Sequence, residues 1–362
     1  MRVLVIMKRF GANKDMVMQN FGRQVRLFES LSKLGRKIDF LCPDYKKFEN
    51  KDIKRNKINF YIRPYSPLNH FQFIKILKNL IKKNKYDFIV STTDPLIGIL
   101  GYRYSKKFDV KHIYDMQDEY SSYDAYKIPF IKNLDKKAVK NSDIVITVSD
   151  SLNKYVKKNR KKPTYTIQNG IDLGLFKKID KSSARKILKL PKGRIIVYTG
   201  EISRFKGVDI LIHAFNKIRQ KYPNTYLLLS GKINKNINIK QKNIIFREFP
   251  KREELALGIN AADVAVVPNP KNKFTEYCFP YKLCEYMACN VPIVATNVGD
   301  VSVLLKKNHG SLCKPNDVED LSEKIIAALK RKRKVNYRND LRQFTWKKLS
   351  KKLDKIIREI QK

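Results

Sequence analysis

Short apolar runs alternate with amphipathic stretches in two successions, and this pattern constrains the fold more than any other feature. In the first half, the runs RVLVIM, KIDFLC, YDFIVST and SDIVITVS are separated by stretches such as NFGRQVRLFESLSKLG. The rhythm restarts at Arg194 with RIIVYTG, VDILIHAFNKIRQKY, TYLLLSG and DVAVVP. Strands that alternate with helices indicate a parallel sheet covered on both faces. We therefore predict an α/β chain with two such sheets.

The segment between the two successions has the composition of a domain connection. A chain of 362 residues is longer than one core ordinarily organises, so two domains are expected. Asn169 and Gly170 are turn formers, and a polar stretch follows them. We predict an N-terminal domain over 1–175, a C-terminal domain over 176–343 and a last helix over 344–362.

The cysteines and the first apolar run bear on metal binding and compartment. The five cysteines form no CxxC pair and have no histidine cluster beside them, so we expect no metal site and no disulfide framework. The apolar run Val3–Met7 is too short for a signal-peptide core or a membrane span. We expect it to be a buried strand and the protein to be cytoplasmic.

The chain is strongly basic, with 77 Lys and Arg against 34 Asp and Glu and a formal charge of +43. A general bias toward surface lysine, attraction to an anionic membrane, and nucleic-acid binding are the three explanations. No zinc-finger or RNP-type sequence accompanies the charge, so no nucleic acid is expected.

The stretch FQFIKILKNLIKKNK is the candidate for membrane contact. Its apolar residues lie on one helical face with lysines around it, a pattern that suits a helix lying on an anionic bilayer at the inner face of the membrane. The same pattern suits a helix that covers a sheet, and both interpretations stay open. The apolar positions are Phe71, Ile74, Leu77, Leu80 and Ile81.

The loop VYTGEISRFKGVDILIHAF is a candidate anion site, because ligands of such sheets bind beyond the carboxyl ends of the strands. A strand is expected to end at Gly200 and a helix to begin after Gly207, with Arg204 and Lys206 between them. Helix N-terminal amides and two cations are suited to a diphosphate. An ordinary solvated connection is the alternative.

The segment CFPYKLCEYMACNVPIVATN suggests a second part of the same site. Pro280 suits the first turn of a helix that carries Lys282 and Glu285 on one face. The carboxylate is suited to ribose hydroxyls and the lysine to phosphate, whereas an exposed ion pair between the two is the alternative.

The order of these motifs resembles the family-4 type of retaining glycosyltransferases, from residue 1 to the final helix. The segments that carry the resemblance are SDIVITVSDSL, TIQNGIDLGLF, VYTGEISRFKGVDILIHAF, LLLSG, AADVAVVPNP and PYKLCEYMACNVPIVATNVGD. The resemblance implies a GT-B fold, in which two Rossmann-like domains face each other across a cleft and the last helix crosses back to the N-terminal domain. It also implies a nucleotide-diphosphate sugar as donor substrate, retention of configuration, and no cofactor or essential metal.

Several residues match the family's donor site. Lys206 matches the lysine of the KG motif at the donor diphosphate, and Glu285 matches the second glutamate of the EX7E motif at the ribose. Val298 and Gly299 match a loop whose amides approach the donor, and Gly200 is the strand-end glycine.

The sequence departs from the family pattern at two positions. Glu201 stands where the family has an arginine, so Arg204 is the candidate substitute. Tyr277 stands where the first glutamate of EX7E is expected, and Glu276 lies one place early. The segment resembles a subgroup that reads PxKxxEYMAxxxP, in which Lys282 becomes an additional phosphate ligand.

The N-terminal domain contributes two candidate residues through the resemblance. Gly11 lies where related enzymes bring backbone close to the donor phosphate, although a glycine also merely suits a loop. Asp115 lies where many relatives have a catalytic-site histidine, in a stretch that lines the cleft near the reacting sugar. His112 lies within the preceding strand, where a structural role is expected.

We therefore predict a retaining hexosyltransferase that acts on a glycan or lipid-linked acceptor in cell-surface polysaccharide or glycoconjugate synthesis. Lys206 and Arg204 are expected to stabilise the leaving diphosphate, with Asp115 as a third catalytic candidate. A sugar-nucleotide epimerase of the same architecture and a non-catalytic nucleotide-sugar-binding homologue are the alternatives.

Overall fold

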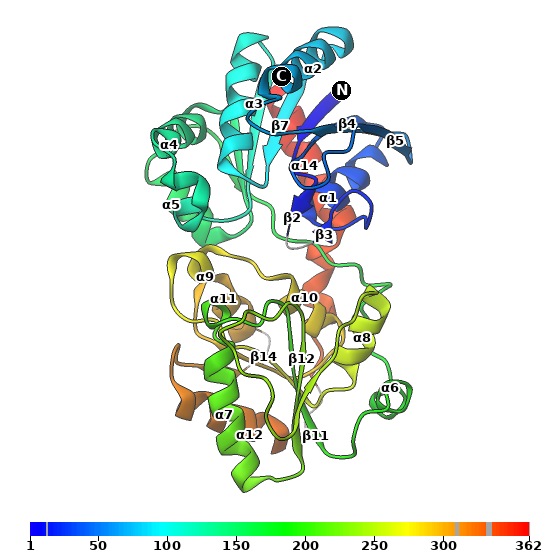
Figure 1. Cartoon of the computed structure of the whole chain (residues 1–362), viewed down its shortest axis with the longest axis vertical. Coiled ribbons are helices and arrows are strands. Elements are labelled where there is room, and N and C mark those ends of the chain that lie inside the picture. Colours follow the sequence, from blue (N-terminus) through cyan, green and yellow to red (C-terminus); the bar gives the residue numbers. More distant parts are fainter. Residues whose placement is uncertain (12–13, 308–310, 331–334, 362) are drawn as a thin grey trace. The chain divides into compact units, whose positions relative to one another are not determined.

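The computed structural model describes residues 1–11, 14–307, 311–330 and 335–361. Its contacts divide the chain into two compact units (Figure 1). The first comprises Met1–Gln168 and Trp346–Lys362, and the second comprises Asn169–Thr345. The last helix thus belongs to the first unit, and the first boundary lies a few residues before position 175.

The first unit contains an eight-stranded sheet in the order β10-β9-β8-β7-β1-β4-β6-β5. All neighbouring strands are parallel except β5 and β6, which form an antiparallel hairpin at one edge. This hairpin was not predicted, because lysine and arginine interrupt the apolar pattern of its strands. The strands are β1 Arg2–Ile6, β4 Lys37–Asp44, β5 Lys51–Arg55, β6 Ile58–Pro64, β7 Phe88–Thr92, β8 Lys111–Met116, β9 Ile144–Thr147 and β10 Thr164–Thr166, with a separate pair β2 Phe10–Gly11 and β3 Lys14–Asp15.

Helices cover both faces of this sheet. Their bounds are α1 Arg23–Ser32, α2 His70–Asn84, α3 Pro95–Lys107, α4 Ile131–Asn141, α5 Asp150–Lys157 and α14 Trp346–Gln361, with 3₁₀ turns η1 Tyr120–Ser122 and η2 Asp124–Lys127. Side chains alternate along a strand, so β1 sends Val3 and Val5 to a core with α1 and α14, and Leu4 and Ile6 to a core with α2 and α3. The run that is apolar at every position is therefore a central strand buried on both faces.

Helix α2 covers the sheet with its apolar face. Ile74, Leu77 and Ile81 are buried in the core against β1 and α3, and Leu80 is partly buried there. Of the five apolar positions considered for a bilayer, Phe71 alone is exposed. The hypothesis that the apolar face of α2 lies on a membrane is wrong, because the sheet covers that face.

The second unit contains a six-stranded parallel sheet in the order β13-β12-β11-β14-β15-β16. Its strands are β11 Arg194–Thr199, β12 Thr225–Ser230, β13 Ile244–Phe246, β14 Val264–Val267, β15 Ile293–Thr296 and β16 Ser311–Cys313. The predicted parallel sheets of both halves are confirmed. The strand β16 was not predicted, because three residues are too few for a periodic signal.

Helices connect the strands of the second unit. Their bounds are α6 Lys181–Ile187, η3 Arg204–Lys206, α7 Val208–Lys221, α8 Arg252–Asn260, α9 Lys273–Tyr277, α10 Tyr281–Ala288, α11 Gly299–Lys307, α12 Val318–Lys330, α13 Arg338–Leu341 and η4 Arg342–Phe344. Helices α7 and α12 share one core with β11, β12 and β14. In the described part of the chain, no helix is both long and apolar enough to cross a membrane.

Candidate active site

The backbone at the end of β11 has a conformation that only a residue without a side chain fits. Gly200 has a φ of +122°, and a Cβ atom there would lie 2.9 Å from the Nζ atom of Lys282. Its backbone is also in close contact with Gly231 at the end of β12, where a Cβ atom would overlap the Gly200 carbonyl. The strand-end glycine therefore brings the lysine of another helix close to the loop backbone.

Lys206 lies at the end of the short turn η3, immediately before Gly207 and α7. The helix start predicted after Gly207 is confirmed. The half-buried lysine has its Nζ atom 3.7 Å from the ring centroid of Phe274 and 5.1 Å from that of Phe205. Cation–π contacts of this kind hold the ammonium group against the two rings. Arg204, the first residue of η3, is exposed.

Lys282 lies in the first turn of α10 and is half-buried. Its Nζ atom lies 3.8 Å from the ring centroid of Tyr198, whose hydroxyl donates to the Glu201 carbonyl at 2.7 Å. Burial, and then the charge of Lys206, lowers the pKa of Lys282 to about 7. Two cations from different elements therefore meet at one strand end at a cost in free energy, which a bound anion would offset.

Glu285 is buried on α10 and pairs with Arg252 at the start of α8, with 3.0 Å between Oε1 and the guanidinium. The exposed ion pair with Lys282, considered as an alternative, does not occur, because the two side chains have different partners. Pro280 is the residue before the helix rather than part of its first turn. Arg252 was missed by the sequence analysis, although a basic residue at a strand-to-helix junction was a usable signal.

Val298 and Gly299 follow β15 and lead into α11. Val298 is buried, and Gly299 has a φ of +52°. A Cβ atom at position 299 would overlap the carbonyl of Glu276 at α9, so packing alone requires a glycine there. The approach of these amides to a donor stays a prediction.

Asp115 lies at the end of β8 in the first unit and is fully buried. Arg23 binds it through Nη2 at 2.8 Å and Nε at 3.1 Å, and the Thr92 hydroxyl donates to it at 3.0 Å. Arg23 also donates to the carbonyls of Ile167 and Gln168, where the first unit ends. The carboxylate thus joins α1 to the strand ends, and its predicted contact with the sugar stays a prediction.

Gly11 lies in the β2–β3 hairpin after β1, where a Cβ atom would meet the side chain of Met16. The neighbouring Arg9 is buried and forms ion pairs with Asp15 and Asp44, both at 2.7 Å. This network holds the start of the loop. The structural role expected for His112 is confirmed: it is buried between the hydroxyls of two serines, and burial lowers its pKa to about 3.

Two family models match consecutive parts of the chain. The Glycosyltransferase Family 4 model matches residues 24–175, and the Glycosyl transferases group 1 model matches residues 180–348. The chain is a glycosyltransferase. Residues 180–348 fall within the second unit except for the start of α14, so the group 1 model spans the turn η3 with Lys206 and the helix α10 with Lys282 and Glu285.

One curated relative of this glycosyltransferase and two solved structures match over nearly its whole length. An uncharacterized glycosyltransferase of Methanocaldococcus jannaschii is 26% identical over 357 residues, which is 92% of this chain and 93% of that protein. Sucrose-phosphate synthase from Thermosynechococcus elongatus superimposes with a TM-score of 0.80 at 21% identity, covering 99% of this chain and 98% of that one. Anabaena HepE in complex with UDP-glucose superimposes with a TM-score of 0.77 at 16% identity, covering 99% of both chains. The predicted GT-B fold is confirmed.

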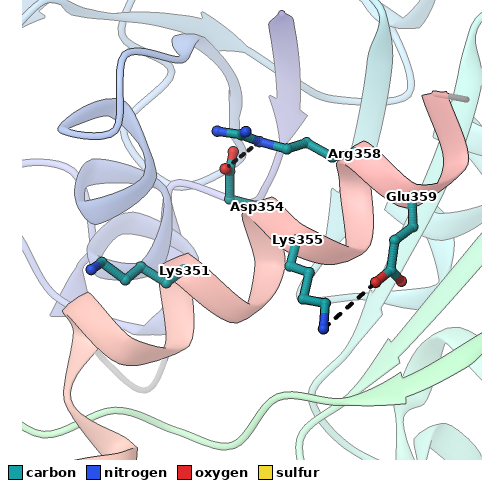
Figure 2. Close-up of a pocket in the computed structure, with 5 residues that line it drawn as sticks. All are labelled: Lys351, Asp354, Lys355, Arg358 and Glu359. Atoms are coloured by element: carbon teal, nitrogen blue, oxygen red, sulfur yellow. Dashed lines mark hydrogen bonds and ion pairs between the residues drawn. The ribbon is translucent and has the colours of Figure 1, made fainter.

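A surface hollow of the glycosyltransferase lies outside this site. This hollow is formed by side chains of α14, with an ion pair of 2.8 Å between Asp354 and Arg358 and one of 3.9 Å between Lys355 and Glu359 (Figure 2). It belongs to one helix and includes none of the predicted donor-site residues. Among the residues that the structure describes, no group of three His, Cys, Asp or Glu side chains is arranged to hold a metal ion.

Proposed function

We propose that this glycosyltransferase takes a hexose from a nucleotide-diphosphate sugar and transfers it, with retention, to a glycan or lipid-linked acceptor. The donor diphosphate binds at the end of β11, between Lys206 and Lys282. The ribose binds at Glu285. A uridine nucleotide is the first donor to test, because the similarly folded HepE is recorded in complex with UDP-glucose.

The observation that carries this proposal is the pair of lysines at Gly200. Lys206 comes from the loop after β11, and Lys282 comes from α10. Burial first, and then repulsion from the charge of Lys206, lowers the pKa of Lys282, so the charged form of this lysine is destabilised. A diphosphate removes this repulsion by accepting hydrogen bonds from both ammonium groups.

The same arrangement is suited to leaving-group stabilisation. When the bond between the anomeric carbon and the β-phosphate oxygen breaks, negative charge develops on the departing diphosphate while the sugar becomes oxocarbenium-like. Lys206, Lys282 and the first amides of α7 stabilise that charge, and the exposed Arg204 of η3 is the third cation proposed for it. The leaving phosphate then accepts the acceptor's proton on the same face of the sugar, so no side-chain nucleophile is required.

The role proposed for Asp115 is positioning. Its carboxylate is held by Arg23 and Thr92, so it orders the strand ends of the first unit rather than reacting with the sugar. The nearby Asp118, which accepts from the Tyr123 hydroxyl at 2.7 Å, and the half-buried Gln117 are the polar groups better exposed for an acceptor hydroxyl.

The test is a thermal-shift and turnover screen of the purified protein with UDP-, GDP- and ADP-sugars, repeated with Lys206→Met. A ligand that binds only the folded state raises Tm. We expect one nucleotide sugar to stabilise the wild type and to be hydrolysed slowly, and Lys206→Met to lose both effects. The matched control is Lys221→Met at the exposed end of α7, which should retain both.

The outcomes separate the proposed activity from its alternatives. Binding without hydrolysis or transfer to any added acceptor would support a non-catalytic homologue and contradict the proposal. Conversion of the donor's sugar without release of nucleotide would indicate an epimerase. Equal loss of binding in Lys206→Met and Lys221→Met would remove the donor site from the end of β11.

A further inference from the structure

Exposed apolar side chains are concentrated just before and at the start of α4. Ile128, Phe130 and Leu134 are 49%, 78% and 44% exposed. Phe130 immediately precedes α4 and Leu134 lies in its first turn, where the Leu134 amide donates to the Phe130 carbonyl at 2.9 Å. We call these three residues the apolar tip. Such a cluster of large apolar groups on a surface marks an interaction site.

The backbone presents Phe130 in an unfavourable conformation. Its φ of +65° and ψ of −19° lie in the left-handed region, which a bulky residue rarely adopts. The strain is maintained by the helix start, where the amides of Asn133 and Leu134 donate to the Phe130 carbonyl at 3.0 and 2.9 Å. The aromatic ring gains no burial within the chain in return. Backbone strain without a packing gain points to a function for the side chain.

Lysines surround the apolar tip on the same helix. Lys132, Lys136 and Lys137 are exposed. The one acidic residue of α4, Asp135, is buried and accepts hydrogen bonds from two tyrosine hydroxyls. Asp124 nearby is paired with Lys127 at 2.7 Å. The surface around the tip is therefore cationic.

A second exposed apolar pair lies at the same edge of the same sheet. Leu68 and Phe71, at the start of α2, are 97% and 85% exposed. Helices α2 and α3 share one core, and α4 packs against α3, so all three helices lie on one face. Helix α2 follows β6, and α4 follows β8 after η1 and η2; these two strands point the same way in the sheet, with β7, β1 and β4 between them.

We propose that this edge of the first unit docks on an anionic membrane surface. The apolar tip and the Leu68–Phe71 pair enter the headgroup region, and the lysines of α4 meet lipid phosphates. A membrane fits better than a second copy of this chain, because the two cationic surfaces, on chains of formal charge +43, would repel each other. This inference is independent of the donor site. It supplies a reason for the enzyme to meet a lipid-linked acceptor.

The main test is flotation of the intact protein with vesicles of phosphatidylcholine alone and of phosphatidylcholine with phosphatidylglycerol. We expect binding to the anionic vesicles, and a decrease of about tenfold or more in the partition coefficient for Phe130→Asn. Asparagine tolerates the left-handed conformation, so Tm should be unchanged or raised and lost binding is not unfolding. The matched control is Ile187→Asn, because Ile187 is 62% exposed beside basic residues of α6 in the second unit.

A second pair of variants separates local from total charge. Lys132, Lys136 and Lys137 changed together to Gln should weaken binding strongly. The same change at Lys235, Lys240 and Lys242, three exposed lysines of the second unit, removes equal charge and should have a small effect.

Four results would overturn the proposal. They are no binding to anionic vesicles, binding unchanged by Phe130→Asn, equal losses from both lysine triplets, and a dimer in solution that Phe130→Asn dissociates without any vesicle binding. The last result would assign the apolar tip to a second copy of the chain. Because vesicle binding needs no nucleotide sugar, failure here leaves the donor screen unaffected.

Discussion

The titration of Lys282 gives the donor site a measurable pH dependence. In the free protein, burial and the charge of Lys206 lower the pKa of this lysine to about 7. Its charged form is therefore favoured below pH 7 and lost above it. If the donor diphosphate binds the charged form, affinity should be highest in mildly acidic solution and fall as pH rises through 7, with a proton taken up on binding near neutrality.

The magnitude follows from the fraction of charged lysine. With a pKa of about 7, that fraction falls about tenfold between pH 6 and pH 8, and the apparent Kd rises by the same factor, about 1.4 kcal/mol. Isothermal titration calorimetry with an intact nucleotide sugar is the assay, because each of its two phosphates has one ester and one anhydride bond and therefore stays singly ionised over this range. Repeating the titration at pH 7 in buffers of different ionisation enthalpy counts the protons taken up.

Two variants make the result specific to Lys282. Lys282→Arg keeps a permanent charge, so any binding that remains should lose its pH dependence between pH 6 and 8. Lys282→Met should bind about as weakly at pH 6 as the wild type does at high pH, also without a slope. A wild-type Kd that does not change between pH 6 and pH 8, or a slope that persists in Lys282→Met, would refute the role given to this lysine.

Four further variants test the contacts on which the fold and site depend. Burial raises the pKa of Asp135 to about 6, so the folded state holds this proton more tightly than the unfolded state, and the stability of the wild type falls as pH rises from about 4 to 7. Asp135→Asn has no such proton, so the difference between its free energy of unfolding and that of the wild type, measured by urea titration, should increase by about 3 kcal/mol over this range. Arg23→Met leaves Asp115 charged and buried without its main partner, and should lower the free energy of unfolding by about 3–5 kcal/mol; a loss below 1 kcal/mol would contradict the structural role of the pair. Glu285→Gln should weaken nucleotide-sugar binding about tenfold in calorimetry, whereas Arg252→Gln should chiefly lower Tm, and the reverse ranking would place the ribose elsewhere.

Local patterns were sufficient for the parallel sheets and for several boundaries. The run at the chain start is apolar at every position, and this predicts a central strand because both of its faces must be covered. Gly207 marks the start of α7 because a left-handed residue precedes the helix. The β5–β6 hairpin escaped prediction for the opposite reason, since an edge strand exposed to solvent has lysine and arginine where a central strand has valine.

The residues that the charged side chains contact could not be predicted from the sequence. Lys282 and Glu285 lie three positions apart on one helix, and spacing alone suggests that they interact. In the structure Lys282 lies against Tyr198 and Gly200 of β11 and its loop, and Glu285 binds Arg252 of α8. These partners come from strands and helices that are distant in sequence, and they meet because the parallel sheet brings its carboxyl ends to one edge.

The sequence by itself determined the two α/β sheets, the excess of positive charge and the segments that carry the lysines proposed for the donor site, because each of these follows from composition or from short-range periodicity. Only the tertiary structure decided which charges are paired and which apolar residues are left exposed. The amphipathic pattern of α2 is the same for a bilayer and for a sheet, and folding buried it against the sheet. Phe130 carries no periodic signal, yet it is exposed because the backbone turns through a left-handed residue just before α4. Burial depends on what lies opposite a side chain, and that is fixed only when distant segments pack together.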